Sequence, residues 1–255
     1  MKQNTRSTPE ELRNWSAWPA SVGVLITTRE GGVSAAPFDS LNLGAHVGDA
    51  SEAVAENRRR FRAALGDGVR PMWLDQVHGT NVVVADEVDG PLPRADAAVT
   101  DAAGVACVVM TADCLPVLLT HRSGRVVGAA HAGWRGLCDG VVERTLDAMG
   151  CAAAEVVAYL GPAIGPEVFE VGPEVREKFL VTDRGARSCF EPSPWHPDQR
   201  YVADLYELCR RRLRAAGVIE VGGGAACTFR EEERYFSYRR DGRTGRMASA
   251  IWRLE

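Results

Sequence analysis

Two histidines and one cysteine, far apart in the sequence, carry side chains that can bind a single metal ion. His78, Cys114 and His131 each stand in a short turn beside Gly or Asp. Two imidazoles and a thiolate with an open fourth position form a recognised catalytic zinc arrangement. The same residues also suit a cysteine nucleophile with a histidine base, or a core thiol and two turn histidines without chemistry. Their spacing matches no local zinc motif, so their placement alone predicts that they converge into one metal or catalytic centre.

Cys114 is placed by the stretch 105–119, in which two apolar runs flank the short polar centre 111–114. Continuous apolar runs rich in Val and Leu are typical of strands covered on both faces. Asp113 and Cys114 are therefore carried into or beside a core, where they cost free energy unless they have partners. We count Asp113 with the candidate catalytic residues: it orients the cysteine or carries a proton, or it only caps a buried turn.

Local patterns predict the other elements. Strands are expected over 22–28, 72–74, 82–84, 125–130 and 156–160, helices over 52–65, 136–149, 173–180 and 203–216, and irregular chain over 183–200. A hairpin is predicted in 235–247, with Asp241-Gly242 at its turn. Strands outnumber helices and do not alternate with them regularly, so the fold class is α+β. Because no linker rich in Gly, Ser or Pro divides the chain, we expect an N-terminal arm over residues 1–20 and a single domain over 21–255.

Composition and charge exclude several classes of partner. The net charge of −4 over 255 residues gives no overall attraction to nucleic acid or to acidic membranes. The sequence contains no run of 18 apolar residues, the length needed to span a membrane, and residues 1–11 lack the apolar core of a signal peptide. The seven cysteines form no C-x-x-C pair, which indicates a reduced, cytoplasmic protein. We expect a monomer that acts on a small molecule.

Seven motifs in order carry a resemblance to a known family. They are Thr28-Arg-Glu-Gly-Gly-Val-Ser, Ser40-Leu-Asn-Leu-Gly, Asp75-Gln-Val-His-Gly-Thr, Ala95-Asp-Ala-Ala-Val-Thr, Thr111-Ala-Asp-Cys-Leu-Pro-Val, Gly128-Ala-Ala-His-Ala-Gly-Trp-Arg-Gly and Ser237-Tyr-Arg-Arg-Asp-Gly-Arg-Thr-Gly-Arg-Met. Together they resemble the YfiH-like, or laccase-domain, family from about Thr28 to Trp252. The resemblance implies a four-layer α/β/β/α sandwich with mixed β-sheets, of the type found in cytotoxic-necrotizing-factor toxins. It also implies a catalytic domain with a zinc centre whose ligands map onto His78, Cys114 and His131.

The activities that the resemblance implies are phosphorolysis of purine nucleosides (adenosine, inosine, guanosine and methylthioadenosine) and deamination of adenosine. For deamination, a zinc ion would lower the pKa of water to ~7. Three alternatives stay open: an amidase that edits a peptidoglycan precursor with Cys114 and a histidine, a copper-dependent polyphenol oxidase, and a non-catalytic metal- or partner-binding protein. Five histidines are too few for the copper centres of a multicopper laccase. A thiolate with two imidazoles suits Zn²⁺, with Cu²⁺ as the competitor.

Phosphorolysis brings phosphate to C1′ of the ribose and therefore needs cationic side chains. Arg135 is the first candidate because it follows the Gly133 turn at the start of a predicted helix. The second candidates are Arg239 and Arg240, unless they are merely solvated hairpin residues. The family resemblance also implies that Asn42 and Arg58 contact the nucleoside.

Other residues near the motifs are candidates for the pocket wall. Gln76 and Trp134 flank the predicted ligands and are expected to line the pocket. His46 lies in a Gly-flanked loop, either near the site or in a structural role. His121 and His196 are predicted to be surface histidines.

Overall fold

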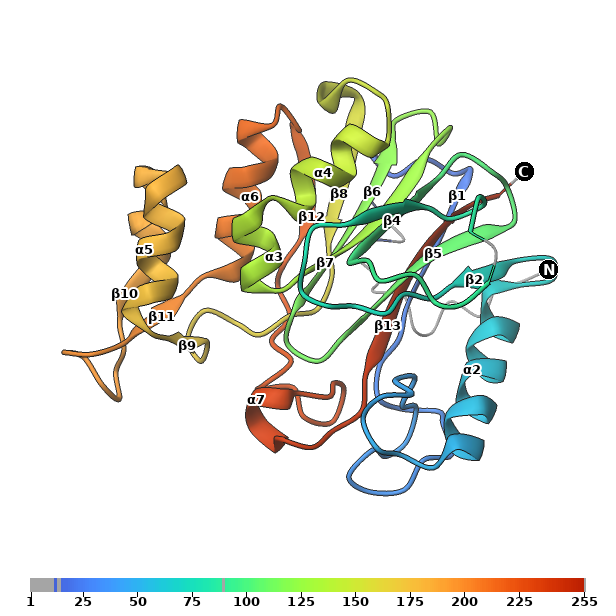
Figure 1. The fold of residues 1–255 in the computed structure, drawn as a ribbon, viewed down its shortest axis with the longest axis horizontal. Coiled ribbons are helices and arrows are strands. Elements are labelled where there is room, and N and C mark those ends of the chain that lie inside the picture. The colour runs from blue at the N-terminus through green and yellow to red at the C-terminus, as the bar shows by residue number, and fades with distance from the viewer. Residues whose placement is uncertain (1–11, 13–14, 89, 255) are drawn as a thin grey trace.

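The computed structural model describes Leu12, residues 15–88 and residues 90–254. Two mixed β-sheets lie face to face, with helices on the outer face of each (Figure 1). One sheet has the strand order β1-β13-β5-β2 and the other the order β12-β8-β6-β7-β4-β3. The protein is thus an α+β single-domain α/β/β/α sandwich with mixed sheets, as the sequence predicts.

The bounds of the strands and helices are as follows. The first sheet consists of β1 (Val22–Ile26), β2 (Arg70–Met72), β5 (Val105–Thr111) and β13 (Met247–Arg253). The second consists of β3 (Val82–Val84), β4 (Ala97–Thr100), β6 (Leu115–His121), β7 (Val127–Ala132), β8 (Val156–Leu160) and β12 (Glu220–Gly223). The helices are α2 (Ser51–Leu65), α3 (Trp134–Asp139), α4 (Val141–Ala148), α5 (Pro173–Thr182), α6 (Leu205–Ala215) and α7 (Tyr238–Asp241), with short 3-10 turns at Ala153–Glu155 and Arg184–Cys189.

Alternation along β5 shows why this strand is apolar throughout. Val105, Cys107 and Val109 point into the core between the two sheets. Ala106 and Val108 point the other way, into the core under α2. Successive side chains of a strand face opposite sides of the sheet, so a strand with a covered layer on each side needs apolar residues at every position.

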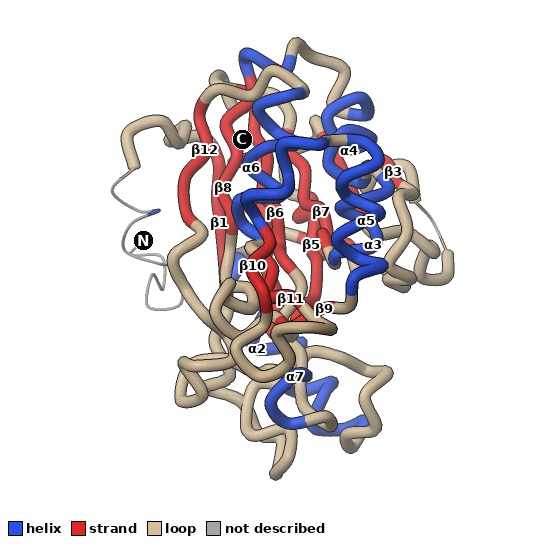
Figure 2. Tube along the Cα trace, turned by 90° about the vertical axis from the view of Figure 1, so that its left-hand side faces the viewer, coloured by secondary structure: helices blue, strands red, loops and turns tan. Residues whose placement is uncertain are grey.

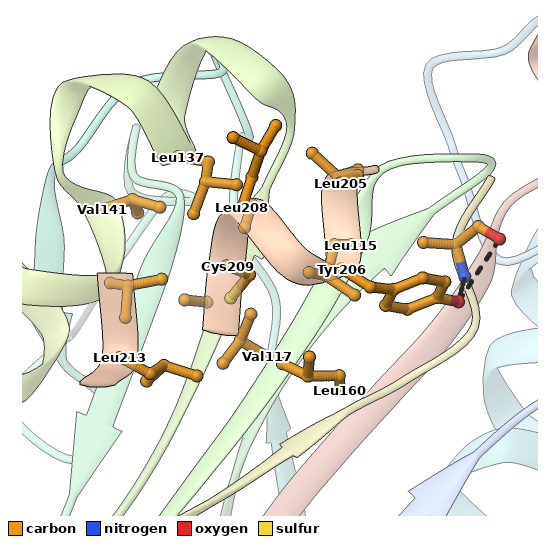
Figure 3. Close-up of a cluster of buried hydrophobic side chains, with 14 of the residues drawn as sticks. Leu115, Val117, Leu137, Val141, Leu160, Leu205, Tyr206, Leu208, Cys209 and Leu213 are labelled. Atoms are coloured by element: carbon orange, nitrogen blue, oxygen red, sulfur yellow. Dashed lines mark hydrogen bonds between the residues drawn. The ribbon is translucent and has the colours of Figure 1, made fainter. Parts of the chain in front are cut away.

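The core on the other side lies between the second sheet and its helices. Figure 3 shows apolar side chains of α6 facing Leu115 and Val117 of β6 and Leu160 of β8. The phenol of Tyr206 on α6 accepts a hydrogen bond from the backbone N–H of Ala163 at 2.7 Å. This contact ties α6 to the chain that follows β8.

Several elements differ from the sequence-based expectation. The strand expected over 72–74 is found at Arg70–Met72, and the stretch 183–200, expected to be irregular, contains a 3-10 turn at Arg184–Cys189 and strand β10 (Phe190–Pro192). The helix predicted over 136–149 is divided into α3 and α4 at Gly140, which has a left-handed φ of 97°. The predicted hairpin in 235–247 is wrong: Ser237 caps the one-turn helix α7 through its hydroxyl, which accepts from the N–H of Arg240. A side-chain cap competes with strand pairing for the same backbone groups, and here the helix forms.

The outer parts of the chain pack on this body. Strands β9 (Glu170–Val171), β10 (Phe190–Pro192) and β11 (Tyr201–Ala203) form a small antiparallel sheet near α5. Trp15 and Trp18 pack around Tyr159, with ring centroids 6.2 and 6.4 Å from it. Most of the predicted arm over 1–20, namely 1–11 and 13–14, lies outside the described residues. Within the described chain, none of the helices combines the length and apolar character needed to cross a bilayer.

Candidate metal centre

The crossing from one sheet to the other brings the three candidate ligands together. Cys114 lies between the end of β5 in the first sheet and the start of β6 in the second. On the neighbouring strand β7, His131 stands opposite Pro116 in the register. His78 reaches the same point from a turn, and the ligand atoms of all three residues lie within 4.8 Å of one another. The Cys114 Sγ is 3.9 Å from the Nε2 of His78.

One buried carboxylate holds both histidines. Asp96 is 0% exposed and accepts hydrogen bonds from the backbone N–H groups of Val77, His78 and Gly79 at 3.2, 2.9 and 2.6 Å. These bonds stabilise the left-handed conformation of His78, whose φ is 59°. Asp96 also accepts from the Nδ1 of His131 at 2.8 Å, which leaves the Nε2 of that ring for a metal.

A second carboxylate holds the turn that carries the cysteine. Asp113 has a backbone φ of 94°, in the left-handed region that residues other than glycine rarely adopt. Its two oxygens accept from the hydroxyl of Thr228 and from the backbone N–H of Arg239, each at 2.7 Å. Its carbonyl accepts from the N–H of Ile164 at 2.9 Å. Asp113 therefore connects four segments of the chain next to the candidate ligand.

The charges of these groups are mutually dependent. Burial opposes ionisation of Cys114, but the imidazoles of His131 and His78 outweigh burial and lower the pKa of the thiol. Burial likewise opposes a charged His131, yet the thiolate and the Asp96 carboxylate raise the pKa of this imidazole. The thiolate is the form of cysteine that binds metals, so the surroundings of Cys114 favour its binding form.

The space around the three ligand atoms also suits a metal ion. Gly133 lies against it: a Cβ there would come within 3.0 Å of the Cys114 sulfur and of the His78 ring. Glycine thus leaves open the volume into which the three donors point. Two imidazole nitrogens and one thiolate are a donor set that Zn²⁺ accepts with an open fourth position. The residues present therefore fit a bound metal, which the donors alone do not identify.

A cavity of about 510 Å³ opens beside the candidate ligands. Its walls combine the three ligands with guanidinium groups and aromatic rings. The residues that line it are His46, Gln76, His78, Met110, Thr111, Ala112, Asp113, Cys114, His131, Trp134, Arg135, Ile164, Phe169, Tyr238, Arg239 and Arg246. Of the residues named from the sequence, Gln76, Trp134, Arg135 and Arg239 lie in this wall together with the predicted ligands.

Three residues predicted to bind substrate lie outside the cavity lining. Arg240 donates to the carbonyls of Thr228, Phe229 and Tyr235 and pairs with the Asp241 carboxylate. Arg58 donates to the Leu43 carbonyl and stacks over the Trp73 ring at 4.3 Å. Asn42 is fully buried.

Gln76 lines the cavity, but its amide is used within the protein. The side chain donates to the Met110 carbonyl at 2.8 Å and accepts from the Met110 N–H at 2.7 Å. It pairs with the end of β5 as a neighbouring strand would, and this holds the turn before His78 against the chain before Cys114.

The remaining histidines have three different surroundings. His46 lies at the cavity rim, where burial and the nearby Arg246 and Arg58 lower the pKa of its imidazole. The prediction that His121 is a surface residue is wrong, because it ends β6, is 8% exposed, and bonds Ser123 through Nδ1. His196 is exposed, as predicted, and pairs with Glu170.

Sequence reasoning gave no role to four residues of this site. Asp96 has a visible signal, since it is a lone carboxylate in an alanine-rich strand and needs a partner when buried. Arg246 and Tyr238 lie within the last motif of the family resemblance, without a spacing that marks them. Phe169 follows an irregular stretch, and nothing in its neighbourhood distinguishes it from a core residue.

The fold and the site together define a class: a four-layer sandwich with a candidate His-Cys-His metal centre at the crossing between its sheets. Comparison with known proteins identifies the family within this class. Residues 23–254 match the family described as multi-copper polyphenol oxidoreductase laccase. The chain belongs to this family, the YfiH-like or laccase-domain family that its motifs resemble.

Relatives and a solved structure agree with this assignment. A purine nucleoside phosphorylase of Pseudomonas aeruginosa is 56% identical over 239 residues, which cover 94% of this chain and 96% of that protein. The purine nucleoside phosphorylase YfiH of Escherichia coli is 51% identical over 237 residues, covering 92% and 96%. A Neisseria meningitidis protein of known crystal structure has a TM-score of 0.91 and 50% identity, over 95% of this chain and 98% of that one. Relatives with these names support an enzyme that acts on a small molecule.

Proposed function

We propose that this protein is a zinc-dependent purine nucleoside phosphorylase. One observation carries the proposal: a single cavity joins three metal-binding side chains to the guanidinium groups of Arg135, Arg239 and Arg246. A phosphorolytic site needs cations for the phosphate and a means of stabilising charge at the reacting bond. The names of the relatives support the choice of purine nucleosides as substrates.

His78, Cys114 and His131 would hold the metal, with Asp96 and Asp113 fixing their positions. A bound zinc ion supplies a Lewis acid to an oxygen in the cavity. We propose zinc because two imidazoles and a thiolate with an open position are used by catalytic zinc sites, and metal analysis would distinguish it from copper. Asp113 acts in this proposal as a positioning residue, because both of its oxygens already accept hydrogen bonds.

In the reaction, an oxygen of inorganic phosphate forms a bond to C1′ of the ribose while the bond from C1′ to the purine nitrogen breaks. The electron pair of the broken bond goes to the base, which takes a proton, and ribose 1-phosphate leaves as the second product. Trp134, Phe169 and Tyr238 supply aromatic faces for the purine. The arginines hold the phosphate near the sugar and neutralise its charge.

Adenosine deamination at the same centre is a second candidate activity. It is favoured by the position of Cys114, which lines the cavity, so that water reaches the metal site from the substrate side. Among the described residues of the lining, however, Asp113 is the one carboxylate, and it is engaged in structural bonds. Phosphorolysis, which uses cations, is therefore the better supported activity.

The test combines metal analysis with product analysis. Purified protein should contain about one zinc per chain, and inosine should yield hypoxanthine and ribose 1-phosphate only when phosphate is present. Adenosine incubated without phosphate tests for inosine, the product of deamination. Absence of phosphate-dependent base release at full zinc occupancy would refute the main proposal.

The same samples distinguish the other chemistries. Activity that survives chelation but not alkylation of Cys114 would indicate a thiol amidase, and phenol oxidation that follows copper content would indicate an oxidase. Metal binding without any turnover would indicate a binding protein. We further propose a cytoplasmic location, since the cysteines are free thiols, and the monomeric state expected from the sequence stays a prediction. Cell fractionation and sedimentation would test these two points.

A further inference from the structure

Arg246 is a half-buried cation that lacks an anionic partner. It lies between α7 and β13 and lines the cavity beside the candidate metal ligands. One terminal nitrogen donates to the carbonyls of Thr244 and Gly245 at 3.1 and 3.0 Å. Among the described residues, no carboxylate forms an ion pair with Arg246, and its Nε and second terminal nitrogen have no acceptor. Burial accordingly lowers the pKa of this guanidinium.

Two other partly buried arginines are paired with carboxylates. Arg211 forms two bonds to the Asp183 carboxylate at 2.7 and 2.9 Å, and Arg212 pairs with Glu143 at 2.8 Å. Partial burial of a guanidinium without a counter-charge is unfavourable, and the two nitrogens of Arg246 that lack an acceptor among the described residues stay open to the cavity. A cavity-lining arginine left unpaired is thus prepared for an anion that comes from outside the protein.

The protein also builds a support under Arg246. The Asn42 Oδ1 accepts from the backbone N–H groups of Arg246 and Gly44, both at 2.9 Å. The Asn42 Nδ2 donates to the Gly44 carbonyl at 3.2 Å and to the Asp49 carboxylate at 2.9 Å. The amide of Asn42 is therefore fully used within the protein, and its effect on a substrate passes through Arg246.

Gly44 completes the support from the other side. A Cβ at Gly44 would come within 2.8 Å of the Arg246 Cγ, so glycine allows the arginine stem to pack directly on the backbone. The Leu43 N–H donates to the Arg246 carbonyl at 3.1 Å. The motif Ser40-Leu-Asn-Leu-Gly44 thus fixes one side chain that stands 202 positions after Gly44 in the sequence.

Negative groups of the protein face Arg246, but they are committed elsewhere. Cys114 and Asp113 are the acidic groups whose charges act on it most, together with the Tyr238 phenol, whose ring lies 5.9 Å from the guanidinium. Cys114 is a candidate metal ligand, and both Asp113 oxygens accept hydrogen bonds from Thr228 and Arg239. The anion that Arg246 would bind is therefore a ligand.

The other two cavity arginines are less suited to this task. Arg135 is exposed and stacks over the Trp134 ring at 4.5 Å. Arg239 donates to the Glu170 carbonyl at 2.8 Å and lies over the Phe169 ring at 5.4 Å. Arg135 keeps its charge in water, and Arg239 is partly satisfied, so each gains less from an added anion than Arg246 does.

We propose that Arg246 is the principal anchor for the inorganic phosphate that the reaction consumes, held in place by Asn42 and Gly44. This inference rests on the proposed phosphorolysis and assigns the phosphate to the side of the cavity lined by His46, Tyr238 and Arg246. Two N–H groups of a guanidinium match two phosphate oxygens. The phosphate would then lie within the same cavity as the candidate metal, where the ribose C1′ must also be placed.

The experiment measures phosphate binding by calorimetry on zinc-loaded protein, with and without the product base hypoxanthine. Arg246→Gln should weaken phosphate binding about 10- to 100-fold, the usual cost of a lost hydrogen bond to a charged group. In turnover, the KM for phosphate should rise with the KM for inosine nearly unchanged. Arg246→Lys, which keeps the charge, should restore part of the binding. Arg243→Gln is the matched control, because Arg243 is in the same segment but donates to the Gly48 carbonyl outside this cavity.

Each outcome has a separate meaning. Equal phosphate binding by wild type and Arg246→Gln, at equal zinc content and an unchanged circular dichroism spectrum, would overturn the inference and leave phosphorolysis standing. The inference is also overturned if removal of zinc abolishes binding while Arg246→Gln does not weaken it, or if wild type binds no phosphate at all. Phosphate binding that depends on Arg246 without any turnover would support the anion site and refute the proposed reaction.

Discussion

The two walls of the cavity are built in different ways. The wall with the candidate metal ligands is formed where β5, β6 and β7 meet the turn of His78. His131 is 3% exposed and Asp96 0%, whereas Cys114 is half-buried and His78 is exposed. The other wall is lined by His46, Tyr238, Arg239 and Arg246, and α7 lies with its neighbouring loops at one end of the sheets (Figure 2). There Tyr238 is 59% exposed.

This difference separates two tasks. Side chains held at the ends of strands and in turns by the buried carboxylates of Asp96 and Asp113 keep a constant geometry, which a metal centre requires. Loops on a rigid scaffold are where recognition of a ligand is usually placed. The metal wall should therefore respond to substitution through metal affinity, and the loop wall through substrate and phosphate binding. Four substitutions test this separation.

Cys114→Ser should have the largest effect. It removes the thiolate from the candidate donor set, so zinc should fall from about one per chain to near zero. Turnover should fall by more than the roughly 100-fold that loss of an outer partner of a metal ligand costs. Metal analysis by mass spectrometry measures the first quantity. Cys151→Ser, at a half-buried cysteine outside the cavity, is the control, and full zinc in the Cys114 variant would contradict the assignment.

Asp96→Asn comes next, since it leaves all three ligands in place. The Oδ1 of Asp96 accepts from the His78 N–H and the His131 Nδ1, and its Oδ2 accepts from the N–H groups of Val77 and Gly79. An amide can keep one of these pairs of bonds but places its NH2 group against the donors of the other, so zinc affinity should fall about 10- to 100-fold. Competition with a coloured chelator gives the affinity, and the spectrum of the cobalt-substituted protein reports changed ligand geometry. Asp86→Asn, which affects a bond to the Thr100 hydroxyl, should leave both unchanged. An unchanged cobalt spectrum in the Asp96→Asn variant would contradict the proposal that Asp96 positions the metal ligands.

Asn42→Ala should affect the loop wall alone. The loss of four buried hydrogen bonds should lower the free energy of unfolding by about 1–3 kcal/mol, and phosphate binding should weaken because Arg246 loses its support. Zinc content should stay at the wild-type level. Denaturant unfolding and metal analysis are compared with Asn81→Ala, which removes one exposed bond. Loss of zinc in Asn42→Ala would show that the two walls are not separable.

Tyr238→Ala should have the smallest effect. An aromatic face stacked on a base contributes about 1–3 kcal/mol, and the exposure of this ring places it at the lower end. The KM for inosine should rise about fivefold, with stability and zinc content unchanged. Tyr238→Phe keeps the ring and should behave as wild type. An unchanged KM in the alanine variant would place the purine against Trp134 or Phe169 instead.

The sequence predicted best what local pattern encodes. The apolar run around Cys114 indicated a doubly covered strand pair, and the predicted convergence of His78, Cys114 and His131 agrees with the distances between their ligand atoms. The expectation of a turn at His131 is wrong, because this residue lies within β7. The sequence failed to predict the structure where distant chain decides the outcome. His121 reads as a surface residue because its partners Ser123 and Glu155 give no pattern, and α7 reads as a hairpin because Asp241-Gly242 suits either turn. The pairing of Asn42 with Arg246 depends on β1, β13 and β5 lying side by side.

Strand β13 has a consequence for the order in which the site can be assembled during synthesis. Residues 247–253 pair with β1 on one side and β5 on the other, so the first sheet has a gap at its centre until they leave the ribosome. His78, Cys114 and His131 are all synthesised earlier, whereas Thr228, Arg239 and Arg246 emerge only just before that strand. The candidate metal ligands are therefore synthesised well before the strand that completes the first sheet, and the side of the cavity that carries Arg239 and Arg246 forms last.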